Sequence, residues 1–253
     1  MDSTHIFQAI DRLKQKGERL VTNCFVGANK LDDADCILTG KSLLFVKHEY
    51  KVDRLLFYTS NINDLLENAV IQLEKGNYYM DITSRNALLY RRELLTSGFE
   101  LTAEMMRLSS RNILKLIETS CDENVGMSGA ITDATAIYDL LWSVFDTSVS
   151  HLPDINEIKA KISQFTLEKN EEGAIISLLQ AVEEPKSFYI NQIYNNGGNI
   201  HGILRSKLKK YSDNGGQYLY SWVDKNNIAS LKFHAKYDMK HDGLWNIVYK
   251  KTR

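Results

Sequence analysis

The feature that most constrains the fold is a change in hydrophobic periodicity near residue 165. In the two predicted helices directly before it, apolar residues recur at helical spacing. After it, they come in short alternating runs separated by turns. The segments Phe165–Glu168, Ala174–Val182 and Ser187–Tyr194 have the pattern of strands, and short polar turns at 170–173 and 183–186 join them. This stretch predicts a three-stranded antiparallel meander.

The elements around the meander follow a recognisable order. One helix precedes it, capped by Thr132 or Asp133 and running to Val144, and a second helix opens at Pro153. After the meander come a loop, a basic helix, a strand, a helix and a last strand. These are predicted at 195–198, 200–211, 218–223, 227–237 and 244–249. The whole order predicts a sheet flanked by helices.

The first 120 residues alternate strand and helix in shorter pieces, which predicts a second, smaller α/β domain. Strands are predicted at 22–26, 42–46, 54–59 and 78–83, helices at 6–20, 87–96 and 112–118, and an extended stretch at 100–108. A further helix, capped within Ser60–Asn63, is predicted to run to Glu74. The polar, glycine-bearing segment 121–130 is the predicted linker, so the domains are predicted at 1–120 and 131–253.

Composition excludes several classes of protein. The 253 residues carry a net charge of −1 and are 43% hydrophobic, which is typical of a globular protein and not of a nucleic-acid binder. The cysteines Cys24, Cys36 and Cys121 are too widely spaced for a disulfide framework or a metal knuckle. No signal peptide and no apolar run of 18 residues is present, so the sequence predicts a cytoplasmic protein with no membrane span.

Two stretches of the C-terminal half carry recognisable motifs. Ser221–Asn227, followed by Ser230, Phe233–His234 and Asp242–Gly243, is similar to the strand, asparagine and helix segment of the GNAT acetyltransferase family. Asn199–Leu204 stands at the place of its Arg/Gln-x-x-Gly-x-Gly/Ala phosphate loop. The resemblance implies a mixed, mostly antiparallel central sheet flanked by helices, an α+β arrangement known as the GNAT fold.

The sequence also departs from the family pattern. Asn199 replaces the usual Arg or Gln, Leu204 replaces the second small residue, Asp238 starts a pair that replaces Gly-Phe, and His234 replaces the usual Tyr. In the N-terminal half, Asn77–Thr83 with the segments 97–100 and 105–107 resembles the second half of a GNAT domain whose phosphate loop has degenerated.

The resemblance implies acetyl-CoA as the acyl donor. Its diphosphate would lie on backbone amides at a helix start, and its pantetheine arm would pair between the strands 187–194 and 218–223. The implied CoA-binding residues are Ile193, Asn199, His201, Gly202, Ile203, Leu204, Asn227 and Ser230. Two alternatives stay open: the glycine loop is a flexible turn, and Asn227 is a helix cap.

By the same resemblance, His234 would protonate the departing thiolate as an imidazolium; the alternative is a structural histidine. Glu168, Glu183 and Glu184 lie near the predicted strands, but the sequence assigns no general base. The acceptor pocket would lie between the first helices and the sheet, with Trp142 and Tyr189 as the substrate-binding residues.

The predicted function is an acetyl-CoA-dependent N-acetyltransferase whose acceptor is the amine of a small molecule or a protein. The alternative is a non-catalytic GNAT-fold protein that binds CoA or serves as a scaffold. A third reading, in which the basic helix Arg205–Lys210 contacts RNA, is opposed by the near-zero net charge, so no nucleic-acid partner is predicted.

Overall fold

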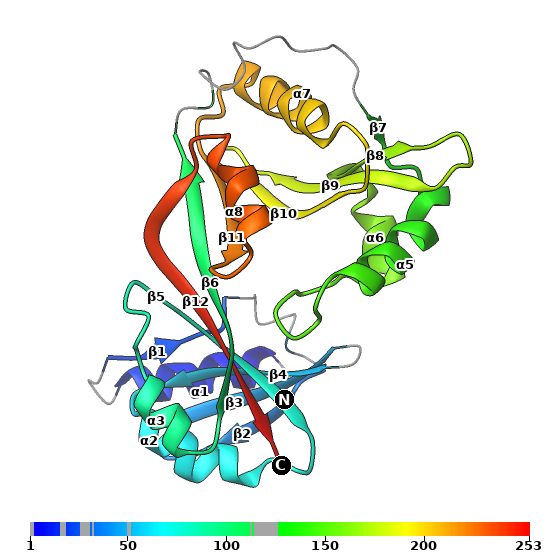
Figure 1. The fold of residues 1–253 in the computed structure, drawn as a ribbon. Helices are drawn as coiled ribbons and strands as arrows, with labels where there is room; N and C mark the ends of the chain where they lie inside the picture. The colour runs from blue at the N-terminus through cyan, green and yellow to red at the C-terminus, as the bar shows by residue number, and fades with distance from the viewer. Residues whose placement is uncertain are drawn as a thin grey trace. The chain divides into compact units, whose positions relative to one another are not determined.

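The computed structural model describes residues 3–15, 19–25, 31, 33–49, 52–111, 113 and 126–253. The chain divides into two compact units, whose elements are labelled in Figure 1. Unit 1 contains residues 1–104, 147–149 and 244–253, and unit 2 contains 105–146 and 150–243. Two long strands, β6 (Glu100–Ser110) and β12 (Lys240–Thr252), contribute residues to both units.

The strands of unit 1 follow the order β2-β3-β4-β5-β12. The described pairings are antiparallel except for the parallel pair of β4 and β5. The elements are α1 (Ser3–Gln15), β1 (Val21–Thr22), β2 (Asp35–Leu38), β3 (Ser42–Glu49), β4 (Val52–Thr59), α2 (Ile62–Asp64), β5 (Asn77–Ser84) and α3 (Arg91–Thr96).

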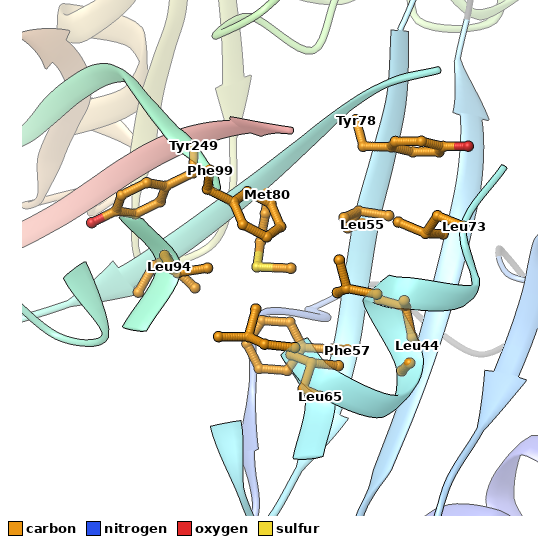
Figure 2. Packing of buried hydrophobic residues seen from close by; sticks show 14 of the residues in the cluster. Leu44, Leu55, Phe57, Leu65, Leu73, Tyr78, Met80, Leu94, Phe99 and Tyr249 are labelled. Carbon is orange, nitrogen blue, oxygen red and sulfur yellow. The ribbon is translucent and has the colours of Figure 1, made fainter. Parts of the chain in front are cut away.

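Unit 1 has two hydrophobic clusters, one between α1 and the sheet and the other between the sheet and the helical segments that join its strands. Figure 2 shows Leu55 and Phe57 of β4 and Met80 of β5 packed together with Leu65 and Leu94. All five are at most 1% exposed. Since full burial of such a side chain contributes roughly 1.5–3 kcal/mol, this cluster is a major source of the unit's stability.

The parallel pair of unit 1 is short, and the chain itself fills the space beyond it. Asp53–Leu55 of β4 pairs with Tyr78–Met80 of β5. Farther along β4, residues 58–59 pair with the strand β1 on the edge that β5 occupies at residues 53–55. Asn23 then bridges the two strands: its Nδ2 donates to the carbonyl oxygens of Leu55 and Asp81, each at 2.9 Å, and its Oδ1 accepts from the Phe57 amide at 2.7 Å.

A buried arginine ties a distant loop to the same strands. Arg54 is 0% exposed. Its guanidinium pairs with Glu49 at 3.0 Å and with Asp81 at 3.3 Å, and it donates to the carbonyl oxygens of Thr147 and Ser148 at 2.9 and 3.3 Å. These contacts explain why residues 147–149 belong to unit 1.

The strands of unit 2 follow the order β6-β11-β10-β9-β8-β7, and among the described pairings only β10 and β11 are parallel. The elements are β7 (Met127–Ser128), α5 (Ala134–Val144), α6 (Ile155–Ala160), β8 (Phe165–Lys169), β9 (Ile175–Glu183), β10 (Phe188–Asn195), α7 (Ile200–Asp213), β11 (Leu219–Asp224) and α8 (Ile228–Ala235). The predicted mixed, mostly antiparallel sheet flanked by helices is confirmed.

Helices cover both faces of the unit 2 sheet. Leu178 and Leu179 are neighbours on β9 and both are 0% exposed, yet they belong to different clusters, because successive side chains of a strand point to opposite faces. Leu179 packs with Ile203 of α7, and Leu178 packs with Leu141 of α5. Figure 1 shows α7 on one side of β9, and α5 and α6 on the other. We call these the α7 face and the α5–α6 face.

Most elements were predicted within a few residues, but several differ, among them the strand β7, which lies in the predicted linker. The strand β2 was not predicted, because its four residues show little alternation. The predicted helix to Glu74 begins where expected, at the Asn61 cap, but continues as a π-turn at Leu65–Ala69 and a 3-10 turn at Val70–Gln72. The helix predicted at 87–96 begins only at Arg91.

The division between the units differs from the predicted one. The last strand, predicted at 244–249, extends from Lys240 to Thr252 and pairs with β5 of unit 1 along 245–252. Sequence patterns could not show this, since the pairing joins residues more than 160 positions apart. The predicted helix 112–118 (except 113) and residues 121–125 of the predicted linker, with Cys121, lie outside the described residues.

Within the described part of the chain, no helix has the length and apolar character needed to cross a membrane.

Candidate functional site

The parallel strands β10 and β11 separate after three residue pairs. Phe188–Ile190 pairs with Leu219–Ser221. Beyond these residues β10 stays paired with β9 and β11 with β6, and a register shift between Ile190 and Gln192 bends β10. Among the described residues, no strand pairs with the facing edges at 191–195 and 222–224. We call this region the splay; its free backbone groups suit an extended ligand.

The start of α7 follows directly from the splayed end of β10. Asn199 is the helix cap: its Oδ1 accepts from the Gly202 amide at 2.9 Å, and its carbonyl oxygen accepts from the Ile203 amide at 3.1 Å. The amides of Ile200 and His201 have no acceptor within the helix, since the first turn precedes the regular hydrogen-bonding pattern. These two donors and the positive end of the helix dipole favour an anion.

A carboxylate of the chain already lies at this helix start. Glu168 of β8 accepts from the Asn199 amide at 2.5 Å and from the Ser177 hydroxyl at 3.1 Å. Gly198 makes room for this contact, because a Cβ there would collide with the Ser177 hydroxyl and the Glu168 carboxylate. The start of α7 therefore binds the carboxylate of Glu168. A phosphate bound at the same place would be repelled by the negative charge of that carboxylate.

Two residues of the predicted phosphate loop have other roles. Ile203 and Leu204 are 0% exposed and pack in the core on the α7 face. The Ile203 amide already donates to Asn199. Both residues are therefore removed from the candidate site. Leu204 does not crowd the loop, because its side chain points into the core.

The side chain of His201 is held by residues at the end of α8. Its Nδ1 lies 2.8 Å from the Tyr237 hydroxyl, its Nε2 lies 3.3 Å from Lys236 Nζ, and its ring stacks on Phe233. Because an ammonium group can only donate, Nε2 accepts and Nδ1–H donates to Tyr237. Burial, then the charges of Lys236 and Arg205, lower the pKa of His201. The contact brings the ammonium of Lys236 beside the first turn of α7.

Asn227 and Ser230 form the cap of α8. The Oδ1 of Asn227 accepts from the Ser230 amide at 2.9 Å, so its predicted alternative role as a helix cap is confirmed. This bond occupies the oxygen of the side-chain amide. Contacts of Asn227, Ser230 or Ile193 with CoA stay predictions; Ile193 lies half-buried on β10 within the splay.

His234 is 3% exposed, and its surroundings favour the neutral imidazole. Its Nδ1 lies 2.7 Å from the carbonyl oxygen of Ser230, which can only accept, so Nδ1 carries the proton. Burial lowers the pKa of His234, against a smaller opposing effect of that hydrogen bond. The Nε2 atom is buried without a partner. This geometry does not favour the imidazolium that the predicted acid role requires.

The two predicted substrate-binding residues lie on the α5–α6 side. Trp142 of α5 packs against the α5–α6 core and donates from Nε1 to the Pro153 carbonyl oxygen at 3.2 Å. Tyr189 of β10 stacks on Tyr220 at 4.8 Å between ring centroids, and its hydroxyl donates to Asn191 at 3.0 Å. Burial, then the neighbouring Tyr220, raise the pKa of Tyr189. Tyr189 is the middle one of the three β10 residues that pair with β11, two residues before the splay begins at Asn191.

The three glutamates near the strands do not gather at the splay. Glu168 lies at the start of α7, as described above. We call the end of β10 that pairs with β11, at Phe188, its closed end. There Glu183 pairs with Phe188 across β9 and β10, and its carboxylate lies 4.0 Å from Lys207 Nζ. The carboxylate of Glu184 accepts a hydrogen bond from the Ser187 hydroxyl nearby. The structure therefore places no carboxylate of this set as a base for an amine held in the splay.

No group of metal ligands occurs among the described residues. A cavity of about 390 Å³ lies at the closed end of β10 and β11, and it contains none of the predicted site residues. Its lining comprises Arg111, Pro185, Lys186, Gly215, Gln217 and Tyr218.

Sequence reasoning missed the role of Glu168 and the proximity of Lys236 to α7. A signal for the first was present: in the antiparallel meander Glu168 pairs with Ser177, and Ser177 pairs with Asn195. This register aligns Glu168 of β8 with Asn195 at the end of β10, across the one strand that lies between them. The helix α7 begins just after that end. No comparable signal existed for Lys236, since its contact with His201 depends on how α8 packs.

Comparisons with known proteins agree on the fold. A GCN5-related N-acetyltransferase from Sphaerobacter thermophilus superposes with a TM-score of 0.56 at 10% identity, covering 84% of this chain and 76% of the other. A conserved protein of unknown function from Staphylococcus epidermidis gives 0.55 at 10% identity, covering 87% and 95%. A tandem GNAT protein from the clavulanic acid biosynthesis pathway gives 0.54 at 8% identity, covering 85% and 81%, so the likeness extends over both units.

No protein-family model matches the sequence, and no curated protein matches it significantly.

Proposed function

We propose, for a chain that has the fold of the GCN5-related N-acetyltransferases, that unit 2 binds acetyl-CoA and transfers its acetyl group to an amine. The observation that carries this proposal is the splay of β10 and β11 beside the start of α7. It offers unpaired strand edges for the pantetheine arm and, at one end of them, free amides for the diphosphate.

The donors for the diphosphate come mostly from the backbone, so they do not depend on the residue types that depart from the family pattern. The amides of Ile200 and His201 supply two hydrogen bonds, and Lys236 supplies a nearby positive charge. Asn199 fixes the helix start by capping Gly202. The replacement of Arg or Gln by Asn199 is therefore compatible with binding.

The transfer itself needs a neutral amine and a thioester held close together. The amine nitrogen attacks the carbonyl carbon, the new C–N bond forms, and the C–S bond breaks with its electron pair on sulfur. The proton lost by the nitrogen ends on the thiolate, and the products are an amide and free CoA. No acid or base is assigned in this site. Its contribution to the rate is to hold the amine and the thioester close together in the geometry of attack.

Calorimetric titration with acetyl-CoA, desulfo-CoA and adenosine diphosphate tests the binding. We expect one site per chain, because Asn23 and β1 fill the equivalent space in unit 1. Binding of acetyl-CoA at micromolar concentration, followed by thiol release with a panel of primary amines, would support the enzyme. No binding of any ligand at millimolar concentration would contradict the proposal.

One observation favours the non-catalytic alternative. The carboxylate of Glu168 at the Asn199 amide weakens any diphosphate site at α7. Acetyl-CoA binding without thiol release for any amine would indicate a protein that binds CoA but does not transfer the acetyl group.

A further inference from the structure

Two glutamines on the α5–α6 face are buried with unpaired side-chain oxygens. Gln180 of β9 and Gln192 of β10 are each 4% exposed. The Oε1 atom of each is buried and has no hydrogen-bond partner. Since a buried polar atom without a partner destabilises the folded state, two such atoms next to each other suggest a ligand that would satisfy both.

The two glutamines are neighbours in the sheet. Gln192 pairs directly with Gln180 across β10 and β9, so their side chains lie on the same face, with about 4.5–5.5 Å between the Cβ atoms. That face is the α5–α6 face, because Leu178, two residues before Gln180, packs in the α5–α6 core.

Their position connects them to the splay. Gln192 is the residue at which β10 resumes its pairing with β9 after the bulge, and from Asn191 onward no described strand pairs with β10 on the side that faces β11. The pair therefore lies beside the region where the proposed function places the acyl donor, on the face that carries Tyr189 and Tyr220.

We propose that the side-chain oxygens of Gln180 and Gln192 accept the two N–H groups of a primary amine and so position it for attack on the acyl donor in the splay. This inference rests on the proposed function and assigns the residues that position the acceptor amine. A neutral primary amine has two N–H groups and one lone pair. When two acceptors hold both N–H groups, the lone pair is left to attack the thioester carbon.

The arrangement predicts discrimination between primary and secondary amines. A secondary amine has one N–H, so one of the two oxygens stays unpaired and the extra alkyl group occupies the place of a hydrogen. A site built to receive a hydrogen-bond donor rejects an analogue that lacks it. We expect a preference for the primary amine of at least about tenfold in kcat/KM.

The first test needs no substrate. Gln180→Met, Gln192→Met and the double variant replace each amide with an apolar chain of similar size. If the oxygens are unpaired in the free protein, the double variant should unfold about 3–6 °C higher than the wild type. Gln217→Met, at an exposed position of the same unit, is the control and should change the midpoint by less than about 2 °C. A lower midpoint for both single variants and the double variant would mean that internal water or neighbours satisfy the oxygens, and would overturn the proposal.

The second test uses acetyl-CoA and matched amines. Benzylamine, phenethylamine, 1,4-diaminobutane and a lysine peptide are each compared with their N-methyl counterparts. We expect the glutamine variants to lose at least about tenfold in kcat/KM for the primary amine and to lose the preference over the N-methyl form, with the Kd for acetyl-CoA unchanged. An unchanged preference in both variants, or no transfer to any primary amine by a protein that binds acetyl-CoA, would overturn the inference.

The two tests separate this inference from the proposed function. If wild-type protein does not bind acetyl-CoA, the proposed function fails, and the acceptor role fails with it. If acetyl-CoA binds and is consumed but the glutamine variants behave as wild type, only the inference about Gln180 and Gln192 fails.

Discussion

The two units contain the same succession of elements but differ in what occupies the space between their parallel strands. In unit 1 the succession is β4, a helical segment, β5 and α3, and in unit 2 it is β10, α7, β11 and α8. Each succession runs into a strand that contributes residues to both units, β6 after α3 and β12 after α8. Each parallel pair meets over three residue pairs. In unit 1, β1 and Asn23 fill the region beyond. In unit 2, no described strand pairs there, so the comparison locates the candidate site in unit 2.

The helical segments that follow the first strand of each pair differ in a related way. In unit 1 the Asn61 side chain caps the first turn, and the Asp64 carboxylate accepts from the hydroxyls of Thr39 and Ser42. In unit 2 Asn199 caps α7, and Glu168 approaches from another strand. Asp64 is bonded within its unit by several donors, whereas Glu168 leaves amides of α7 available. In unit 1 the polar groups at the helix start are used within the fold and stabilise it. In unit 2 the helix start leaves amide donors for a ligand.

The largest expected effect is on stability, and it tests the parallel strands β4 and β5 of unit 1. Arg54→Met removes the buried guanidinium that pairs with Glu49 and Asp81 and leaves the carbonyl oxygens of residues 147 and 148 without its N–H donors, and should lower the free energy of unfolding by about 3–5 kcal/mol. Lys207→Met removes the looser pair with Glu183 in unit 2 and should change it by less than about 1 kcal/mol. Urea denaturation measures both. Equal losses would contradict the difference between the two units.

The next effect tests the open helix start of unit 2. Gly202→Glu places a negative charge in the first turn of α7, where it stabilises the helix but repels a diphosphate. We expect the Kd for acetyl-CoA to rise about 100-fold, or roughly 2.7 kcal/mol. Gly202→Gln is the neutral control and should retain most of the affinity. If calorimetry gives the same Kd for both variants, the diphosphate does not bind at α7.

A smaller effect of opposite sign tests the carboxylate that shares this helix start. Glu168→Gln keeps the size of the side chain and removes its negative charge beside the Asn199 amide. Acetyl-CoA should bind about five- to tenfold more tightly, since the repulsion between like charges is lost. Glu184→Gln, at the closed end of β10, serves as the control. Weaker binding by the Glu168 variant would show that its charge supports the site.

The smallest effect is a dependence of stability on pH. Burial lowers the pKa of His234, so below the ordinary value of about 6.5 the unfolded chain binds a proton that the folded chain does not. The free energy of unfolding should therefore fall as the pH decreases from 7 to 5, by at most about 1.4 kcal/mol per pH unit for this group. His234→Gln should flatten the dependence, measured by urea denaturation at each pH. An unchanged slope would mean that the pKa of His234 is the same in the folded and unfolded states.

The sequence predicted the parts of the site that depend on neighbours along the chain. The α7 helix begins at Ile200 as predicted, since Asn199 caps it. The Asn227 cap and the strand β10 were also predicted within one residue. The roles of Ile203 and Leu204 were missed, because the family motif places them near the ligand while the helix turns both side chains into the core.

The amino-acid sequence by itself determined which segments become strands and helices, and in which order, because periodicity, caps and turns act over a few residues. The tertiary structure alone decided how these segments are used. It placed β12 beside β5, Asn23 between β4 and β5, and Glu168 at the start of α7. It also left the oxygens of Gln180 and Gln192 buried and unpaired. Each of these depends on residues far apart along the chain, whose meeting is set by packing and strand pairing and has no local pattern in the sequence.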